Sequence, residues 1–320
     1  MLSTILNRRS NVARLSWVSV FGLTVSGWLV FGVGLLALLE FKGRLAPPPL
    51  SATACIDEKI SFLRDRDLSQ VRIMGAGSSA TWRNLDMSVF GLDPTRALNA
   101  APCYLHIDQT AFLVSLLAEM MPNLQNVITI VAPRDFEDCP PQFTQIFDPS
   151  LGAVFIQKQM PVWLPYVVNM RAPYILRTAI TLPSERALNA QDAYGSSPLK
   201  QATSWRPAPV FDERCFVAFK NYSLNMAQKH VRLWIATVPT MPEWADSYDP
   251  TGIIVKDWTH RLKALSQSGT KLVDGREISF RSEQFADPVH LLSPFHHEFS
   301  QFIAERIRFG SKLERRANAF

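Results

Sequence analysis

The chain has 320 residues, enough for one large domain or two small ones with a full hydrophobic core. Its formal net charge is +5, yet it carries no basic stripe interleaved with aromatic residues and no nucleic-acid-binding motif, so we expect no nucleic acid partner. Much of the excess positive charge lies at the two ends of the chain. Basic ends beside a hydrophobic segment indicate contact with a membrane surface, although ordinary solvated charge explains the C-terminal group equally well.

The first predicted element is a transmembrane helix over residues 15–39, a run without any charged residue. About 20 apolar residues in a helix cross the core of a bilayer, so this run is long enough to span it. It is too long for a typical signal-peptide core, and no small-residue cleavage site follows it directly. A cleavage or lipoprotein signal at Ala52–Cys55 is the disfavoured alternative, because it lies well past the apolar run.

The charges that flank this helix predict its orientation. Three arginines lie in the preceding tail, which we expect to be cytoplasmic and to cover residues 1–14, whereas Lys42 and Arg44 follow the helix. The positive-inside rule therefore favours a cytoplasmic N-terminus. We expect a single-pass protein of the cytoplasmic (inner) membrane, with its C-terminal domain outside the cytoplasm.

A connector is predicted over residues 40–67, in which Pro47-Pro48-Pro49 favours a stiff, extended chain. The main domain is then expected over residues 68–320. Four cysteines fit an oxidising compartment and allow three pairings. They lack the Cys-x-x-Cys or mixed Cys/His spacing of a structural zinc site, so we expect no metal. The cysteines are Cys55, Cys103, Cys139 and Cys215.

The main domain alternates strand and helix patterns. Short apolar, β-rich runs predict strands, and longer runs with apolar residues at helical spacing predict helices. Such alternation implies an α/β fold in which helices cover both faces of a parallel sheet. In sheets of this kind, ligands bind at the carboxyl ends of the strands. The predicted strands are 71–76, 97–100, 126–132, 231–238 and, more weakly, 271–273; the predicted helices are 110–121, 256–265 and 294–309.

Residues 136–215 interrupt this alternation with several prolines and a polar loop. We interpret them as an insertion folded over the edge of the sheet, which serves either as a lid or as a peripheral structural addition. Cys139 and Cys215 bracket the insertion, and a disulfide between them would close a long loop. A second bridge between Cys55 and Cys103 is the less secure expectation.

Two short strings far apart in the chain carry candidate chemistry. Gly77-Ser78-Ser79 follows the first predicted strand, and Asp287-Pro288-Val289-His290 precedes the last predicted helix. A serine hydroxyl needs a neighbouring imidazole to accept its proton, and that imidazole needs an acidic partner to fix its tautomer. When an Asp lies three residues before a His, one tight turn supplies both the base, which is the His, and the group that orients it, which is the Asp.

These strings resemble the first and last sequence blocks of the SGNH (GDSL-like) hydrolase superfamily, in particular its membrane-anchored cell-envelope branch. The resemblance covers roughly residues 68–308 and implies a three-layer α/β/α, flavodoxin-like domain. By the same match Ser79 is the nucleophile, His290 the base and Asp287 the orienting acid. Ser78 stands where the usual Asp is found and is the competing candidate for the nucleophile.

Two further blocks of the superfamily, which supply oxyanion donors, are altered here. Tyr104 stands about where a glycine is expected, and its backbone amide remains able to donate. Arg134 stands in the position of an asparagine. It could stabilise an oxyanion, bind an anionic group of the substrate, or form an ion pair with the neighbouring Asp135, and we favour the ion pair.

The remaining histidines carry no expected function. His296 and His297 follow His290 closely, but adjacent side chains on a helix point in different directions, so we expect no metal site. The triad chemistry also requires no cofactor.

The resemblance implies a membrane-tethered serine esterase or O-acyltransferase that acts on a cell-envelope polysaccharide ester. A multi-pass membrane acyltransferase is then a candidate partner, and the carbohydrate is the substrate. The alternative from a different class is a binding or assembly subunit of a polysaccharide-modifying complex. Such a subunit would keep the fold, while its altered oxyanion blocks would leave it catalytically weak or inactive.

Overall fold

The computed structural model describes residues 2–51, 53–140, 145–177, 179–180, 190–203, 208–267 and 269–317, with side chains described between residues 17 and 308. The chain divides into two compact units. The larger unit comprises Leu50–Pro161 and Ala187–Phe320, and the smaller comprises Met1–Pro49 and Val162–Arg186. The predicted insertion is therefore shared between the two units, and its residues 141–144, 178, 181–189 and 204–207 lie outside the described part of the chain.

A five-stranded sheet forms the centre of the larger unit, and all its neighbouring strands are parallel. Its order is β2-β1-β3-β4-β5. Each strand coincides with one of the predicted strand runs, so the predicted α/β class with a parallel sheet is confirmed. The strands are β1 (Ile73–Gly75), β2 (Ala97–Asn99), β3 (Asn126–Val131), β4 (Arg232–Thr237) and β5 (Thr270–Val273).

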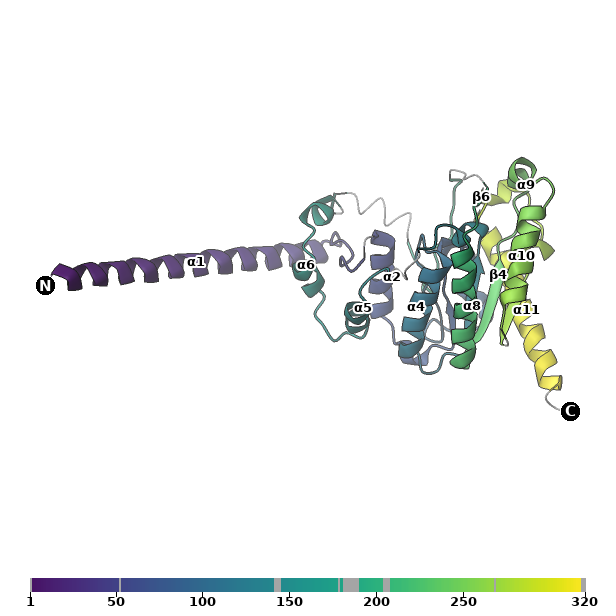
Figure 1. Ribbon diagram of the computed structural model, residues 1–320, viewed down its shortest axis with the longest axis horizontal. Helices are drawn as coiled ribbons and strands as arrows, with labels where there is room; N and C mark the ends of the chain where they lie inside the picture. Colours follow the sequence, from purple (N-terminus) through teal and green to yellow (C-terminus); the bar gives the residue numbers. More distant parts are fainter. Residues whose placement is uncertain are drawn as a thin grey trace. The chain divides into compact units, whose positions relative to one another are not determined.

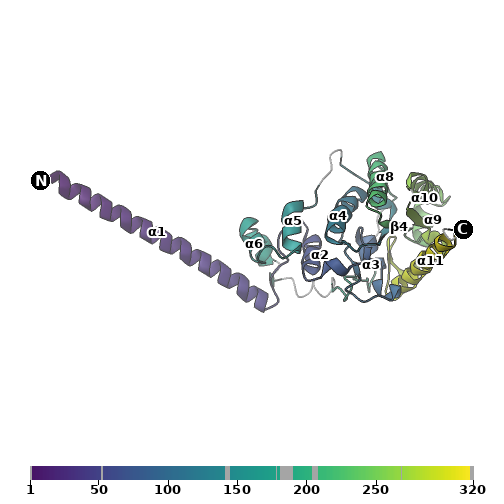
Figure 2. The same cartoon turned by 90° about the horizontal axis from the view of Figure 1, so that it is seen from below.

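Helices lie on both faces of this sheet. On one face α8 packs against both α4 and α10 (Figure 1), and on the other α3 packs against α11. Figure 2 shows β4 between α8 and α10 on one side and α3 and α11 on the other. The bounds of these helices are α3 Ser79–Asn84, α4 Ile107–Met120, α8 Glu213–Gln228, α10 Ile253–Leu265 and α11 Phe295–Ala317.

Shorter elements complete the larger unit. They are α2 (Ala54–Arg64), α5 (Pro149–Ile156), α9 (Pro242–Tyr248), the antiparallel pair β6 (Phe285–Asp287) and β7 (His290–Leu291), and the 3-10 turns η1 (Leu68–Gln70), η2 (Met87–Phe90), η3 (Pro133–Phe136), η4 (Gly275–Glu277) and η5 (Ser282–Gln284).

Helix α8 is one element that the sequence analysis did not anticipate. It forms because a buried stripe at helical spacing runs along Cys215, Phe219, Tyr222 and Met226, and Asp212 caps its first turn by accepting a hydrogen bond from the Arg214 amide. The helix connects β3 to β4, which parallel strands require.

The larger unit begins at Leu50, ahead of the start near residue 68 that we expected. Helix α2, within the predicted connector, buries Ile56, Ile60 and Leu63. It also buries Lys59, whose Nζ donates hydrogen bonds to the carbonyl oxygens of Asn99 and Gly195 and to Gln191. Burial lowers the pKa of this amine well below its usual value. These contacts tie α2 to the end of β2, so α2 is part of the domain.

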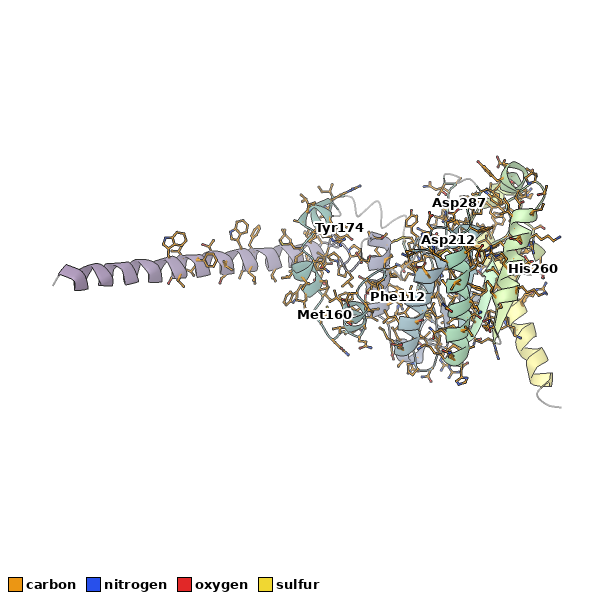
Figure 3. All side chains as sticks on the ribbon, viewed as in Figure 1. Phe112, Met160, Tyr174, Asp212, His260 and Asp287 are labelled. Carbon is orange, nitrogen blue, oxygen red and sulfur yellow. A yellow bond between two sulfur atoms is a disulfide. The ribbon has the colours of Figure 1, made fainter. Side chains whose placement is uncertain are left out.

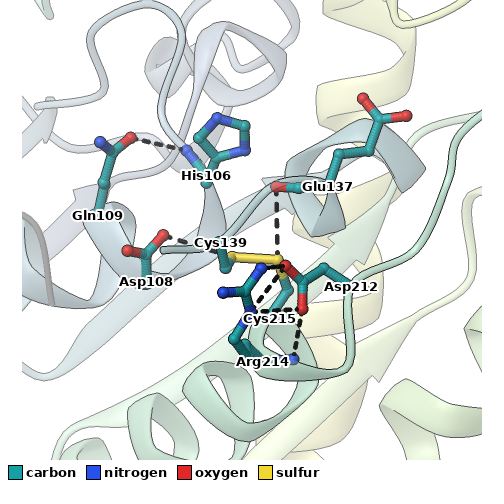
Figure 4. The surroundings of a disulfide bond; sticks show 8 residues. All are labelled: His106, Asp108, Gln109, Glu137, Cys139, Asp212, Arg214 and Cys215. Carbon is teal, nitrogen blue, oxygen red and sulfur yellow. Dashed lines mark hydrogen bonds and ion pairs between the residues drawn. A yellow bond between two sulfur atoms is a disulfide. The ribbon is translucent and has the colours of Figure 1, made fainter. Parts of the chain in front are cut away.

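Both expected disulfides are present. Cys55 and Cys103 have Cα atoms 6.0 Å apart, and those of Cys139 and Cys215 are 5.3 Å apart. Figure 4 shows the Cys139–Cys215 bond next to the Asp212–Arg214 ion pair at the start of α8. The bond therefore fixes the chain after η3 to the first turn of α8.

The smaller unit contains α1 (Leu2–Phe41) and α6 (Leu164–Val168). Within α1, Trp17–Phe41 is long and apolar enough to cross a membrane, and its side chains project without burial (Figure 3). Residues 2–14, which we expected to form a separate tail, continue the same helix because no Pro or Gly interrupts them. The described part of the chain thus has one candidate membrane span, near the N-terminus.

Candidate active site

Ser79 begins α3 directly after β1, at the carboxyl end of that strand. The preceding turn requires glycine at position 77, because a Cβ there would collide with the Thr81 side chain. The Thr81 hydroxyl in turn accepts a hydrogen bond from the Ile130 amide at 2.9 Å, which fixes α3 against β3. Ser78 caps the helix by accepting from the Ala80 amide, so its hydroxyl serves the local turn.

Asp287 and His290 face each other across the two-residue turn between β6 and β7. The Asp287 Oδ1 atom accepts hydrogen bonds from the Val289 and His290 amides at 2.9 and 3.0 Å. Asn84, at the end of α3, holds this hairpin from the serine side. Its side chain donates to the Val289 carbonyl and accepts from the Leu291 amide, both at 2.8 Å. Sequence reasoning missed Asn84, since no local pattern marks it.

The structure brings Ser79, His290 and Asp287 into one hydrogen-bonded chain. His290 Nε2 lies 3.0 Å from Ser79 Oγ, and His290 Nδ1 lies 2.9 and 2.8 Å from the two Asp287 oxygens. All three residues are buried, between 6% and 7% exposed. These distances are within the reach needed for proton transfer from a serine to a histidine base.

The protonation states suit that transfer. Burial opposes the charge on Asp287. Hydrogen bonds from His290 and Thr203, together with the electrostatic interaction with His290, outweigh burial and hold the pKa of Asp287 well below its usual range. Burial lowers the pKa of His290, even though Asp287 partly offsets the effect. His290 is therefore neutral at neutral pH. Because an ionised carboxylate only accepts, the proton lies on Nδ1 and Nε2 is available to Ser79.

Arg134 lies in η3, directly after β3, and its Nη2 donates to Ser79 Oγ at 3.1 Å. The ion pair with Asp135 that we favoured is wrong, as none of the described ion pairs joins these two side chains. Asp135 instead turns inward and accepts from the Ala132 amide at 2.8 Å. Burial raises the pKa of Asp135 to about 6, although this hydrogen bond and the Arg134 charge oppose the shift.

Among the described residues, no hydrogen bond or ion pair joins Tyr104 to Ser79. It lies in the loop after β2 with a left-handed backbone, φ 55°, and its side chain is 68% exposed. The structure therefore provides one side-chain cation at Ser79, from Arg134, while a role for the Tyr104 amide stays a prediction.

A pocket of about 250 Å³ opens next to this group. Arg134, Asp287 and Val289 form its wall on the side of the triad, and its remaining wall is largely apolar. The other lining residues are Pro133, Glu137, Ala208, Pro209, Val238, Pro239, Thr240, Met241, Trp244, Val255, Trp258 and Pro288. Four of these follow β4 directly, so the pocket lies at the carboxyl end of that strand, where parallel sheets bind ligands.

The described end of the predicted insertion also reaches the site. Leu199 pairs with Leu292 through a parallel bridge, and the Thr203 amide donates to the Ala286 carbonyl at 2.7 Å. The Thr203 hydroxyl then donates to Asp287 Oδ2 at 2.7 Å. Sequence reasoning missed this contact because Thr203 lies in a polar loop without periodicity.

Replacing Thr203 by Val should lower turnover about two- to tenfold, the equivalent of one net hydrogen bond. Without this donor the Asp287 carboxylate interacts more strongly with His290, so the His290 pKa should rise and the acid limb of the pH–rate profile should move to higher pH. Rate measurements across the acidic range test this. Thr203→Ser keeps the hydroxyl and should behave as wild type, and an unaltered profile in Thr203→Val would contradict the role.

The neighbouring histidines take no part in the triad. His297 Nδ1 pairs with Asp86 at 2.6 Å, and His296 is buried on α11. No described hydrogen bond joins either of them to Ser79 or Asp287.

A scan against models of protein families finds no match to this chain, and no curated protein matches its sequence. The chemistry inferred for the site therefore depends on the residues and their geometry.

Proposed function

We propose that the chain is a serine esterase or O-acyltransferase of the SGNH (GDSL-like) superfamily that acts on a cell-envelope polysaccharide ester. The hydrogen-bonded chain Ser79–His290–Asp287 carries the proposal. The strand order 2-1-3-4-5 supports it, since this is the order of flavodoxin-like folds. A triad positioned at the carboxyl end of β1 is the arrangement that the resemblance implies.

In the proposed reaction, Ser79 Oγ attacks the ester carbonyl carbon and passes its proton to His290 Nε2. The C–O bond to the sugar breaks as His290 returns this proton to the departing alkoxide, which leaves an acyl group on Ser79. Water, or a hydroxyl of a second sugar, then gives its proton to His290 and attacks the acyl carbon. The bond from that carbon to Ser79 Oγ breaks as His290 returns the proton to Oγ, which regenerates the free serine. The first acceptor gives hydrolysis and the second gives acyl transfer. Asp287 keeps the imidazole in the productive tautomer and stabilises its charged form.

Arg134 is suited to stabilise the oxyanion. The negative oxygen of the tetrahedral intermediate is attached to the carbon that Ser79 Oγ has attacked, two bonds from a hydroxyl that Arg134 already contacts at 3.1 Å. The acyl substituent would occupy the adjacent apolar pocket, because Arg134 and Val289 belong to its wall. Its volume of about 250 Å³ favours a small acyl group.

The proposed location is the outer face of the cytoplasmic membrane, with α1 as the single span. The arginines before the span support this orientation. An acyl donor from inside the cell would need a carrier across the bilayer, which makes a multi-pass membrane acyltransferase a suitable partner.

The full-length protein, in detergent, should react with a fluorophosphonate probe at a stoichiometry close to one. Such probes form a covalent bond only with a serine that a neighbouring base activates. Peptide mapping should place the label on Ser79. Ser79→Ala should abolish labelling, whereas Ser78→Ala should retain it, since the Ser78 hydroxyl caps α3 and hydrogen-bonds to Asp135, and no described hydrogen bond joins it to His290.

Absence of labelling in a folded protein with both disulfides intact would reject the enzyme. It would favour the binding or assembly subunit, in which the fold is retained without turnover. A label on Ser78 would reject the assignment of the nucleophile while retaining the reaction class.

A further inference from the structure

The smaller unit exposes a group of large apolar side chains on residues 163–177, 179 and 180, termed here the apolar segment. Met170 is 77% and Ile180 is 72% exposed, and four others are between 47% and 67% exposed: Trp163, Val167, Val168 and Leu176. Solvent-exposed apolar groups of this density mark a surface that contacts either a partner or a membrane.

The charges of the apolar segment favour a membrane. It contains Arg171 and Arg177 and no acidic residue. Basic residues among Trp, Tyr and aliphatic side chains are typical of chain that lies in the interface of a bilayer with anionic lipids.

Hydrogen bonds hold the apolar segment against the chain that follows α1. Tyr166 donates through its hydroxyl to the Ala46 carbonyl, and Asn169 Nδ2 donates to the Pro49 carbonyl at 3.0 Å. Tyr174, labelled in Figure 3, donates to the Pro47 carbonyl at 3.5 Å. Because prolines lack a backbone N–H, this proline run offers only acceptors, and the apolar segment supplies the matching donors.

The end of α1 lies only a few residues from these contacts. Gly43 has φ 63° and donates to the Glu40 carbonyl, while the Arg44 amide donates to the Leu39 carbonyl. This pattern is a Schellman motif, which ends a helix sharply. Ala46 follows Gly43 by three residues, so at most ~11 Å of chain separates them.

The length of the candidate span locates that end in the headgroup region. Trp17–Phe41 has 25 residues. A helix of that length extends ~37 Å, whereas the hydrocarbon core is ~30 Å thick. The turn at Gly43 therefore emerges among the headgroups, and the residues bonded to Ala46–Pro49 emerge with it.

We propose that the apolar segment is an interfacial membrane-binding element. Its exposed side chains insert at the headgroup–acyl boundary of the leaflet from which α1 emerges, and its arginines face anionic headgroups. The smaller unit thus contacts the membrane by one span and one surface element. The inference rests on α1 crossing the membrane and is independent of the proposed catalysis.

Spin-label accessibility in the full-length protein tests this, in vesicles of phosphatidylcholine with one quarter phosphatidylglycerol. The native cysteines are paired in disulfides, so a single added cysteine takes the label. Val168→Cys and Ile180→Cys report on the apolar segment, and Leu29→Cys reports on α1. Val217→Cys is the matched control, because Val217 is 60% exposed on α8 and Val168 is 61% exposed.

The ratio of oxygen to nickel-chelate accessibility should be several-fold higher at positions 168 and 180 than at Val217, and highest at Leu29. If the label at Leu29 is in lipid while the accessibility ratios at positions 168 and 180 equal that at Val217, the inference is overturned, although α1 still crosses the membrane. Dipolar broadening at 168 without increased oxygen accessibility would indicate a second copy of the chain and would also overturn it. If the Leu29 label is itself in water, anchor and inference both fail, whatever the probe labelling of Ser79 shows.

Discussion

Replacing His290 by Gln should lower the turnover of a hydrolysable ester by about 10⁴- to 10⁶-fold, the range found when a serine triad loses its base. The substituted amide side chain can still occupy the space next to Ser79, but it cannot accept a proton from the hydroxyl. The acyl-enzyme would therefore form only as fast as an unassisted serine allows. Steady-state rates with a chromogenic ester, together with fluorophosphonate labelling, measure the loss.

The pH dependence of the wild-type enzyme follows from the same residue. Burial lowers the pKa of His290, with Asp287 opposing and Arg134 adding to the shift, so its neutral form persists below the usual histidine range. Activity requires the neutral form. The rate should be constant near neutral pH and fall as the pH decreases through this lowered pKa. His290→Gln should lose this acid limb along with its activity.

His297→Gln is the matched control. It makes the same substitution seven residues later, where the imidazole pairs with Asp86 and no described contact joins it to Ser79. Its turnover should remain within about twofold of wild type, since it loses a part-buried hydrogen bond to Asp86 that lies outside the triad. Equal losses in both variants would indicate a general loss of folding, and a His290→Gln enzyme with nearly normal turnover would disprove the triad.

The two parts of the triad could each be predicted from local sequence, whereas the pairing of Ser79 with His290 was implied by the resemblance of the two strings to the SGNH blocks. The spacing of Asp287 and His290 suffices to place them opposite each other across a two-residue turn. The requirement for glycine at position 77 likewise arises within one strand and one helix. What joins the two parts could not be predicted. Asn84 bonds to the Val289 carbonyl across 205 positions of sequence, and no pattern reports a contact of that separation.

The error over Arg134 has a physical cause. We paired it with Asp135 because the two are adjacent in sequence, yet neighbours in a helical turn point in different directions. Asp135 is nearly fully buried and caps the turn through the Ala132 amide, which leaves Arg134 to extend toward Ser79. Helix α2 was missed for a related reason, since the nearby proline run indicated extended chain and the burial of Lys59 is a tertiary effect.

Replacing Arg134 by Ala should lower turnover on the order of a hundredfold, the loss expected for one oxyanion donor. The guanidinium contacts Ser79 Oγ in the resting enzyme, and its charge is needed most when the carbonyl oxygen becomes negative. The interaction is therefore stronger in the transition state than with bound substrate, so kcat should fall while KM changes little. Arg276→Ala, which removes a guanidinium paired with Asp274 outside the site, is the control and should keep wild-type kinetics.

The pH–rate profile separates this role from the alternatives. Arg134 helps to lower the pKa of His290, so its removal should raise that pKa and move the acid limb to higher pH. A raised KM with unchanged kcat would instead indicate that Arg134 binds an anionic group on the substrate. Arg134→Lys keeps the charge but loses the planar donors, so it should retain the wild-type acid limb and recover only part of the turnover. If Arg134→Ala left both the kinetics and the acid limb unchanged, the contact of Arg134 with Ser79 would have no role in the reaction. The triad would then have to act with backbone donors alone.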